Sequence, residues 1–212
     1  MNKVTLRPGE LLAPIPAVMV SCGTMEESNI ITIAWTGTIN SKPPMTYVSI
    51  KPERYSHHII DETREFVINL VSEDLTFAMD HCGQTSGKNE DKFKEMHLTK
   101  VKGDVVSCPM IAECPVNIEC KVVEKKHLGS HDMFLAEIVA VHASEKLMKE
   151  SGRLALNEAN LVASVHGEYY GLKSRRLGTY GYSVMKKSTA KKRKAKGLSY
   201  GGKKAHFETK NK

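Results

Sequence analysis

The residues best suited to chemistry lie near positions 49 to 58, where a predicted strand meets a predicted helix. Ser49 and Lys51 alternate with apolar residues and therefore share one face of the strand. Ser56 is a favoured N-cap for a helix over residues 57–63. With Arg54 beside them, two cations, two hydroxyls and a helix N-terminus come together, which favours binding of an anion, in particular a phosphate. An ordinary solvated turn is the alternative interpretation.

Two further segments extend this site. Residues 29–37 are predicted to form a strand that ends in small and hydroxyl-bearing residues around Trp35, the only tryptophan of the chain. Backbone amides of residues 34–37 could donate hydrogen bonds to a heteroaromatic ligand while Trp35 shields one of its edges; the alternative is a core aromatic residue. Residues 82–93 form a glycine-hinged loop with two hydroxyls and two lysines, which is either a second phosphate arm or a polar loop.

Together these segments resemble the flavin-reductase-like family of FMN-binding split barrels, most closely its flavoredoxin branch. The shared motifs are Asn-x-x-Thr-x-Ala-Trp at 29–35, Arg-Tyr-Ser at 54–56, Asn69, and Thr-Ser-Gly-Lys-x-x-Asp-Lys-Phe at 85–93. The resemblance spans residues 10–182. In the turn Gly129-Ser130-His131-Asp132, Ser130 stands where many members of the family carry an acidic residue.

The resemblance implies a homodimer that holds FMN near the subunit interface without a Rossmann fold. The chain indeed lacks both the Gly-x-Gly-x-x-Gly and the Gly-x-x-x-x-Gly-Lys-Ser/Thr motifs. The family turn makes His131 the candidate contact for the reductant, although a plain turn histidine is the alternative, and no residue is assigned as a catalytic acid or base. The residues and the resemblance together give these cofactor contacts: Thr32, Ala34, Trp35, Thr36, Ser49, Lys51, Arg54, Tyr55, Ser56, Asn69, Cys82, Thr85, Ser86, Gly87 and Lys88.

Three functional hypotheses follow from a bound flavin. The first is an enzyme that uses NADH or NADPH to reduce flavin or another small acceptor. The second is a flavoredoxin-type electron carrier that receives electrons from a separate protein partner. The third is an FMN-binding accessory protein tethered to a partner or to nucleic acid. An intact flavin site favours the first two, and the sequence does not separate them.

The positive charge of the chain is confined to its C-terminal segment. Of 31 basic and 24 acidic residues, eleven basic residues and one acidic residue lie in 186–212, which leaves 20 basic and 23 acidic residues in 1–185. We therefore expect one flavin-binding domain over 1–185 followed by a basic, flexible tail. The tail has few interleaved aromatic residues, which disfavours nucleic acid; a solubilising role or docking of a redox partner are the other interpretations.

Cysteine and histidine patterns argue against disulfides and metals. Five cysteines form no Cys-x-x-Cys pair and are expected to be core residues, although Cys82 could be a reactive thiol. The nine histidines form no metal-ligand array. The apolar stretch 11–20 contains two prolines and is too short to cross a bilayer, so the expected location is the cytoplasm.

The periodicity of the sequence predicts a mainly β fold, a closed barrel with short helices. Runs of period-2 alternation without any repeated unit are typical of small antiparallel barrels. A helix is expected to start at Ser72, and a helical turn is expected over 91–95. The predicted strands are 17–21, 29–36, 46–51, 65–70 and a hairpin of 116–124 with 134–141.

Overall fold

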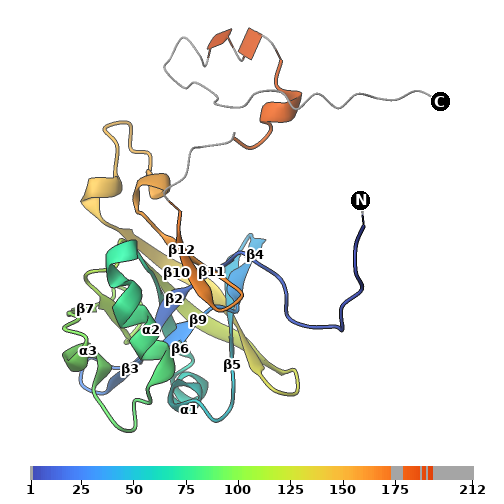
Figure 1. The fold of residues 1–212 in the computed structure, drawn as a ribbon. Helices are drawn as coiled ribbons and strands as arrows, with labels where there is room; N and C mark the ends of the chain where they lie inside the picture. Colours follow the sequence, from blue (N-terminus) through green and yellow to red (C-terminus); the bar gives the residue numbers. More distant parts are fainter. Residues whose placement is uncertain (1, 173–178, 187, 190, 193–212) are drawn as a thin grey trace. The chain divides into compact units, whose positions relative to one another are not determined.

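The computed structural model describes residues 2–172, 179–186, 188, 189, 191 and 192, and divides the chain into two units, 1–172 and 173–212. The first unit contains all the strands and α-helices discussed below (Figure 1). The described part of the second unit contains a 3-10 helix, Tyr182–Val184. Most of the predicted basic tail, 186–212, lies outside the described residues, so the boundary at residue 185 stays a prediction.

The main sheet has seven antiparallel strands in the order β3-β2-β6-β9-β10-β5-β4. The predicted hairpin is confirmed, since β9 pairs with β10 along most of their length, and both strands are longer than predicted. Their side chains alternate between the barrel interior and its surface, which is the origin of the period-2 pattern. The strands are β2 Val18–Gly23, β3 Ser28–Ile33, β4 Thr36–Ser41, β5 Pro44–Ile50, β6 Glu65–Leu70, β9 Val116–His127 and β10 Asp132–Ala143.

The sheet closes on itself between β3 and β4. These strands are consecutive in the chain yet occupy opposite edges of the sheet, and only Ala34 and Trp35 separate them. Two residues cannot span an open seven-stranded sheet, because neighbouring strands are about 4.8 Å apart. The sheet therefore curls until its two edges approach each other. The β4–β5 pairing continues into the connection, where the Ser49 amide donates to the Trp35 carbonyl oxygen at 3.0 Å. The predicted single strand over 29–36 is wrong at its end, because β3 stops at Ile33.

Smaller sheets flank the barrel. β1 Ile15–Pro16 pairs with β11 Val162–Val165, which pairs with β12 Glu168–Gly171. β7 Lys100–Lys102 and β8 Pro109–Ile111 pair to form a two-stranded antiparallel sheet. None of these strands was predicted, because each is short and carries little alternation.

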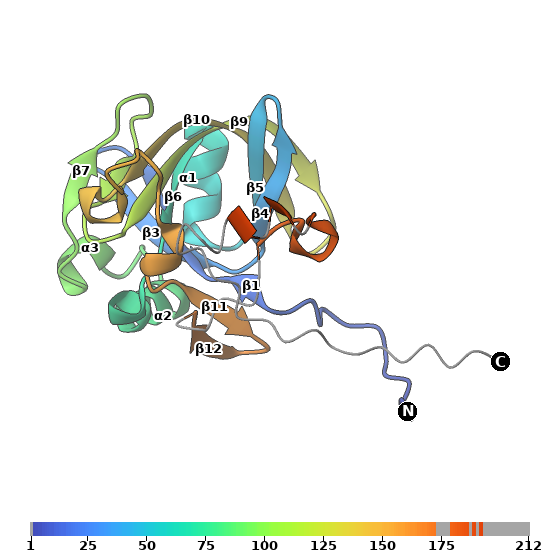
Figure 2. The same ribbon diagram turned by 90° about the horizontal axis from the view of Figure 1, so that it is seen from above.

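Three α-helices are described in the first unit: α1 Tyr55–Thr63, α2 Thr76–Gln84 and α3 Lys92–Glu95, and short 3-10 helices cover Glu145–Leu147 and Leu156–Glu158. A 3-10 turn over Glu73–Leu75 precedes α2, close to the predicted start at Ser72. Asp91 caps α3, and its carboxylate accepts hydrogen bonds from two backbone amides. In Figure 1 α1 lies below the strands, and in Figure 2 it lies between β6 and β5, so it covers one end of the barrel.

The predicted N-cap of α1 is wrong. Arg54 is the N-cap residue, and Ser56 is a fully buried residue inside the first turn. Its hydroxyl accepts a hydrogen bond from Asn29 Nδ2 at 2.7 Å, a partner from β3 that local sequence rules do not reveal. The Ser56 side chain therefore ties α1 to β3 instead of capping the helix.

The barrel interior is filled by aliphatic residues and two fully buried phenylalanines, Phe66 and Phe134. Ile60 of α1 is also fully buried in this cluster, and burial of such a side chain contributes about 2 to 3 kcal/mol. A second cluster, with Met79 and Cys82, fixes α2 against β2 and β3. In the part of the chain that the structure describes, no helix has the length and apolar character needed to cross a membrane.

Candidate functional site

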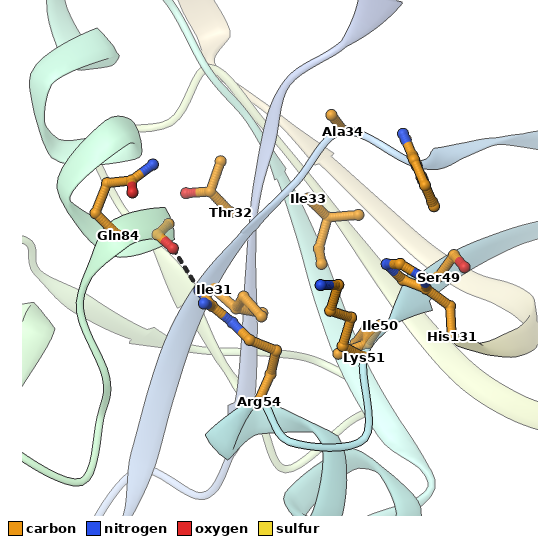
Figure 3. A pocket seen from close by; sticks show the side chains of 12 residues that line it. Ile31, Thr32, Ile33, Ala34, Ser49, Ile50, Lys51, Arg54, Gln84 and His131 are labelled. Carbon is orange, nitrogen blue, oxygen red and sulfur yellow. Dashed lines mark hydrogen bonds between the residues drawn. The ribbon is translucent and has the colours of Figure 1, made fainter. Parts of the chain in front are cut away.

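A cavity of about 370 Å³ opens where the two edges of the sheet meet. One wall is the end of β3 with Ala34 and Trp35, and another is the end of β5. In Figure 3 Lys51 and Arg54 extend toward the space between Gln84 and His131. This cavity, called here the ring cavity, is lined by Ile31, Thr32, Ile33, Ala34, Trp35, Ser49, Ile50, Lys51, Arg54, Gly83, Gln84 and His131.

A smaller cavity of about 170 Å³ lies beside it and is called here the phosphate cavity. It shares Ile31, Arg54 and Gln84 with the ring cavity, so the two form one elongated site. Its walls bring together the first turn of α1 and the loop after α2, as the sequence predicted. The lining residues are Asn29, Ile31, Glu53, Arg54, Tyr55, Ser56, Gln84, Thr85, Ser86, Gly87 and Lys92.

Positive charge lies at the junction of the two cavities. The guanidinium of Arg54 donates to the carbonyl oxygen of Gly83, which holds this cation in place. Lys51 is half exposed and lies 3.8 Å from a Glu53 carboxylate oxygen. No side chain caps α1, and although the His57 amide donates to the Arg54 carbonyl oxygen at 2.8 Å, the earlier amides of the first turn have no intrahelical acceptors. Charges and helix amides together favour an anionic group here.

The far side of the ring cavity is formed by two aromatic rings. The centroids of Trp35 and His131 are 4.6 Å apart, with the ring planes inclined by 40°. Trp35 is 41% exposed, so the interpretation of this residue as a core aromatic is wrong. Ser130 Oγ lies 2.9 Å from His131 Nδ1 and orients the imidazole. This end of the site offers an aromatic, partly apolar surface beside the chain at residues 33–35.

Four of the predicted contacts line neither cavity. Thr36 is buried and donates its hydroxyl hydrogen bond to the Tyr47 carbonyl oxygen. Asn69 is fully buried, where its amide nitrogen bonds Met19 O and Ser21 Oγ and its oxygen accepts from the Ile111 amide. Lys88 lines an adjacent, larger cavity.

Cys82 is the fourth of these residues. Its side chain packs in the core cluster behind α2, because α2 continues through Gln84 and turns the thiol inward. Burial raises the pKa of this thiol to about 11. The expected loop therefore begins later, after Gln84.

Four polar lining residues were missing from the predicted contacts: Asn29, Glu53, Gln84 and Lys92. Lys92 is buried, and its ammonium donates to the carbonyl oxygens of Ile30 at 2.8 Å and Cys82 at 2.7 Å. Burial lowers the pKa of this lysine. Asn29 and Lys92 belong to the motifs on which the family resemblance rests, so these motifs could have predicted them as lining residues. No local sequence pattern predicted Gln84 as a lining residue, since its position depends on where α2 ends.

The donor set of this site fits FMN. The ring cavity has small and apolar walls for a flat ring system, and the phosphate cavity adds the hydroxyls of Ser56, Thr85 and Ser86 to the nearby cations. Gly87 fits closely, because a Cβ atom there would overlap Asn29 Oδ1 and lie 2.7 Å from Tyr55 Cδ1. Among the described residues no group of three His, Cys, Asp or Glu side chains could hold a metal ion.

Comparisons with known proteins agree with this geometry. A model of the family described as flavin reductase like domain matches residues 12–164. The structure of flavoredoxin from Desulfovibrio vulgaris (Miyazaki F) superposes with a TM-score of 0.79 at 29% identity, covering 86% of this chain and 100% of that chain. An FMN-binding protein from Thermus thermophilus with bound 1-cyclohex-2-enone gives a TM-score of 0.71 at 22% identity, covering 84% and 98%, which shows a shared fold.

The curated relatives with a described function include a reductase component. The reductase component of 4-nitrophenol 4-monooxygenase/4-nitrocatechol 2-monooxygenase from Rhodococcus opacus is 30% identical over 112 residues, which are 53% of this chain and 57% of that protein. The structural likenesses confirm the predicted fold class, a mainly β split barrel with short helices.

Proposed function

The chain belongs to the flavin reductase like family, and we propose that it binds FMN and catalyses NAD(P)H-dependent reduction of flavin or another small acceptor. One observation carries the proposal: a ring cavity with small and aromatic walls joins a phosphate cavity beside Arg54 and the first turn of α1. That pairing matches a molecule with a flat ring at one end and a phosphate at the other.

Each part of the site would have a distinct task. Ala34 leaves room for a ring beside the backbone, and Trp35 shields one edge of that ring. Lys51 and Arg54 would neutralise the phosphate, while Ser56 and Ser86 would supply hydrogen bonds, since the Thr85 hydroxyl already donates to the His81 carbonyl oxygen. The aromatic pair at the other end leaves the cavity open on one side, where a nicotinamide or an acceptor could approach.

When bound, FMN supplies the electron-transfer chemistry, and the protein supplies binding and orientation. No lining side chain needs to act as an acid or base. His131 is the imidazole of the ring cavity and remains our candidate for contact with the reductant. The protein would act as a homodimer, as the family resemblance implies.

The likeness to flavoredoxin favours a second function, an electron carrier reduced by a separate protein partner. The two functions differ in their electron donor. An enzyme would be reduced rapidly by NADH or NADPH, whereas a carrier would be reduced chemically or by its partner.

The decisive experiment is a visible absorbance spectrum of the purified protein after addition of FMN and gel filtration, with Trp35 fluorescence recorded alongside. Flavin that co-elutes and quenches Trp35 supports the cofactor, and NADH or NADPH oxidation by the loaded protein then separates enzyme from carrier. Absence of retained flavin would contradict the proposal.

A further inference from the structure

The carboxylate of Asp132 lies between two imidazoles. Its Oδ2 atom is 2.8 Å from His57 Nε2, and its Oδ1 atom is 2.7 Å from His127 Nδ1. The side chains of Asp132 and His57 are 9% and 11% exposed, whereas that of His127 is 71% exposed. The His57 ring also packs against Phe134, with centroids 5.1 Å apart. This is a built polar cluster at the edge of the core.

Two residues of this cluster are next in sequence to residues that line the ring cavity and the phosphate cavity. Asp132 follows His131, which lines the ring cavity, and begins β10. His57 follows Ser56, which lines the phosphate cavity, and belongs to α1. The bond between Asp132 and His57 therefore links the two cavities through the residues next to their walls.

We propose that Asp132 is a positioning residue that holds the β9–β10 turn, and with it His131, against Trp35 in the ring cavity by bridging His57 and His127. Without this bridge the turn residues 128–131 would be held by the backbone ladder and by the bond from the Leu128 amide to the His131 carbonyl oxygen. The consequence for flavin affinity rests on the proposed function, but the placement of His131 does not.

The charges around Asp132 favour its ionised form. His57 faces it from α1 and His127 from β9, while its neighbour on β5 is the uncharged Ile50. Hydrogen bonds from His127 and then from His57 lower the pKa of Asp132. Loss of the carboxylate would leave His57 buried without this partner, which is costly for a polar group. The bridge should therefore be intact at neutral pH.

Trp35 provides a readout that needs no flavin. A ring packed against an indole shields it from a dissolved quencher such as acrylamide, so replacing His131 with Ala should raise the acrylamide quenching of Trp35 emission, and this rise is called here the Trp35 step. The charged groups on the same cavity wall are Lys51 and Arg54, and both are unchanged in every variant compared. The size of the fluorescence step therefore reports how closely His131 lies against Trp35.

The test compares Asp132→Ala with Asp132→Asn in the full-length chain. We expect the Trp35 step, measured in the Asp132→Ala chain, to be less than about half of its size in the wild type, because the turn that carries His131 is released. Asp132→Asn should keep most of the step, since an amide can accept from one imidazole and donate to the other. Flavin binding adds a second readout, with FMN affinity expected to fall roughly tenfold in Asp132→Ala.

The matched control is His142→Ala, which breaks another histidine–carboxylate pair, with Glu119, away from both cavities. Circular dichroism first establishes that each variant is folded; if Asp132→Ala does not fold, His57→Ala replaces it under the same criterion. A folded Asp132→Ala variant, or the His57→Ala variant that replaces it, with the full Trp35 step would overturn the proposal, and so would an equal loss in His142→Ala. Because the Trp35 fluorescence measurement needs no ligand, it tests the placement of His131 even if the protein retains no FMN.

Discussion

The guanidinium of Arg54 donates a hydrogen bond to the carbonyl oxygen of Gly83, so one side chain joins the start of α1 to the last turn of α2. The same residue lines both the ring cavity and the phosphate cavity. Lys51, in contrast, is half exposed and lies near Glu53. The two cations should therefore contribute unequally to ligand binding.

Replacing Lys51 or Arg54 with Ala should weaken binding of FMN much more than binding of riboflavin, because only FMN carries the phosphate. A charge-assisted hydrogen bond contributes about 1.5 to 3 kcal/mol, so we expect FMN affinity to fall about tenfold or more, with the larger loss for Arg54→Ala. Fluorescence titration with both ligands measures this difference.

Lys121→Ala is the matched control, because Lys121 also lies 3.8 Å from a glutamate carboxylate oxygen but lines neither cavity. Equal losses of affinity for FMN and riboflavin in the Lys51 and Arg54 variants would contradict the assignment of a phosphate site.

Gly87→Ala should also lower FMN affinity. An added Cβ would meet Asn29 and Tyr55, so the loop after α2 must move away from the first turn of α1. Gly9→Ala is the control, since the nearest atom to its added Cβ is 4.0 Å away. Isothermal titration with FMN compares the two variants, and unchanged affinity in Gly87→Ala would argue against a phosphate role for this loop.

Glu119→Gln should destabilise the protein at neutral pH. The Glu119 side chain is fully buried and accepts hydrogen bonds from the backbone amides of residues 104–106 and from His142. These bonds lower its pKa from 4.5 to about 2 despite the cost of burial. A shift of this size corresponds to about 3 kcal/mol of stability.

The sign of this effect follows from the lowered pKa. The stabilisation is fully present above the unfolded-state pKa and is lost as the pH falls toward the folded-state pKa near 2. Urea unfolding of Glu119→Gln and wild type should therefore differ most at pH 7 and less at about pH 3. Glu113→Gln is the control, because Glu113 is exposed although it also accepts a backbone hydrogen bond, from Thr99. A difference that does not shrink in acid would contradict this account.

The native thiols should react slowly with a disulfide reagent at pH 8. All five cysteines are buried, and burial raises the pKa of Cys22 and of Cys82 to about 11. Thiolate is the reactive form, so we expect slow labelling of the folded chain and rapid labelling of five thiols in denaturant. Ser130→Cys provides a positive control at an exposed turn. Rapid labelling of Cys82 in the folded wild type would show that the core around α2 opens readily.

Local sequence patterns predicted much of the fold. Alternation located the strands, and the turn at Gly129 located the β9–β10 hairpin, because both signals depend on neighbouring residues. The errors arose where a distant residue decides the outcome. Ser56 has the right side chain for an N-cap, but its hydroxyl accepts a hydrogen bond from Asn29 of β3, and the residue lies inside the helix.

The same reasoning explains which site residues were predicted. The cations, hydroxyls and Trp35 were found because strand and helix ends bring them to one edge of the barrel. Cys82 was misplaced because Gly83 suggested a loop, whereas this glycine lets α2 pack closely on β3; an added Cβ would lie 3.0 Å from Thr32 Cβ. Close packing of this kind depends on tertiary structure and leaves no local pattern.

The closure at Ala34 and Trp35 also bears on the order of folding. The ring cavity at this closure is also lined by β5, the end of α2 and the β9–β10 turn, which are distant in sequence, so it is complete only when these non-local contacts have formed. The ring cavity should thus form late, and flavin would bind only the finished barrel. Added FMN should slow unfolding without accelerating refolding, a distinction that stopped-flow measurements can make.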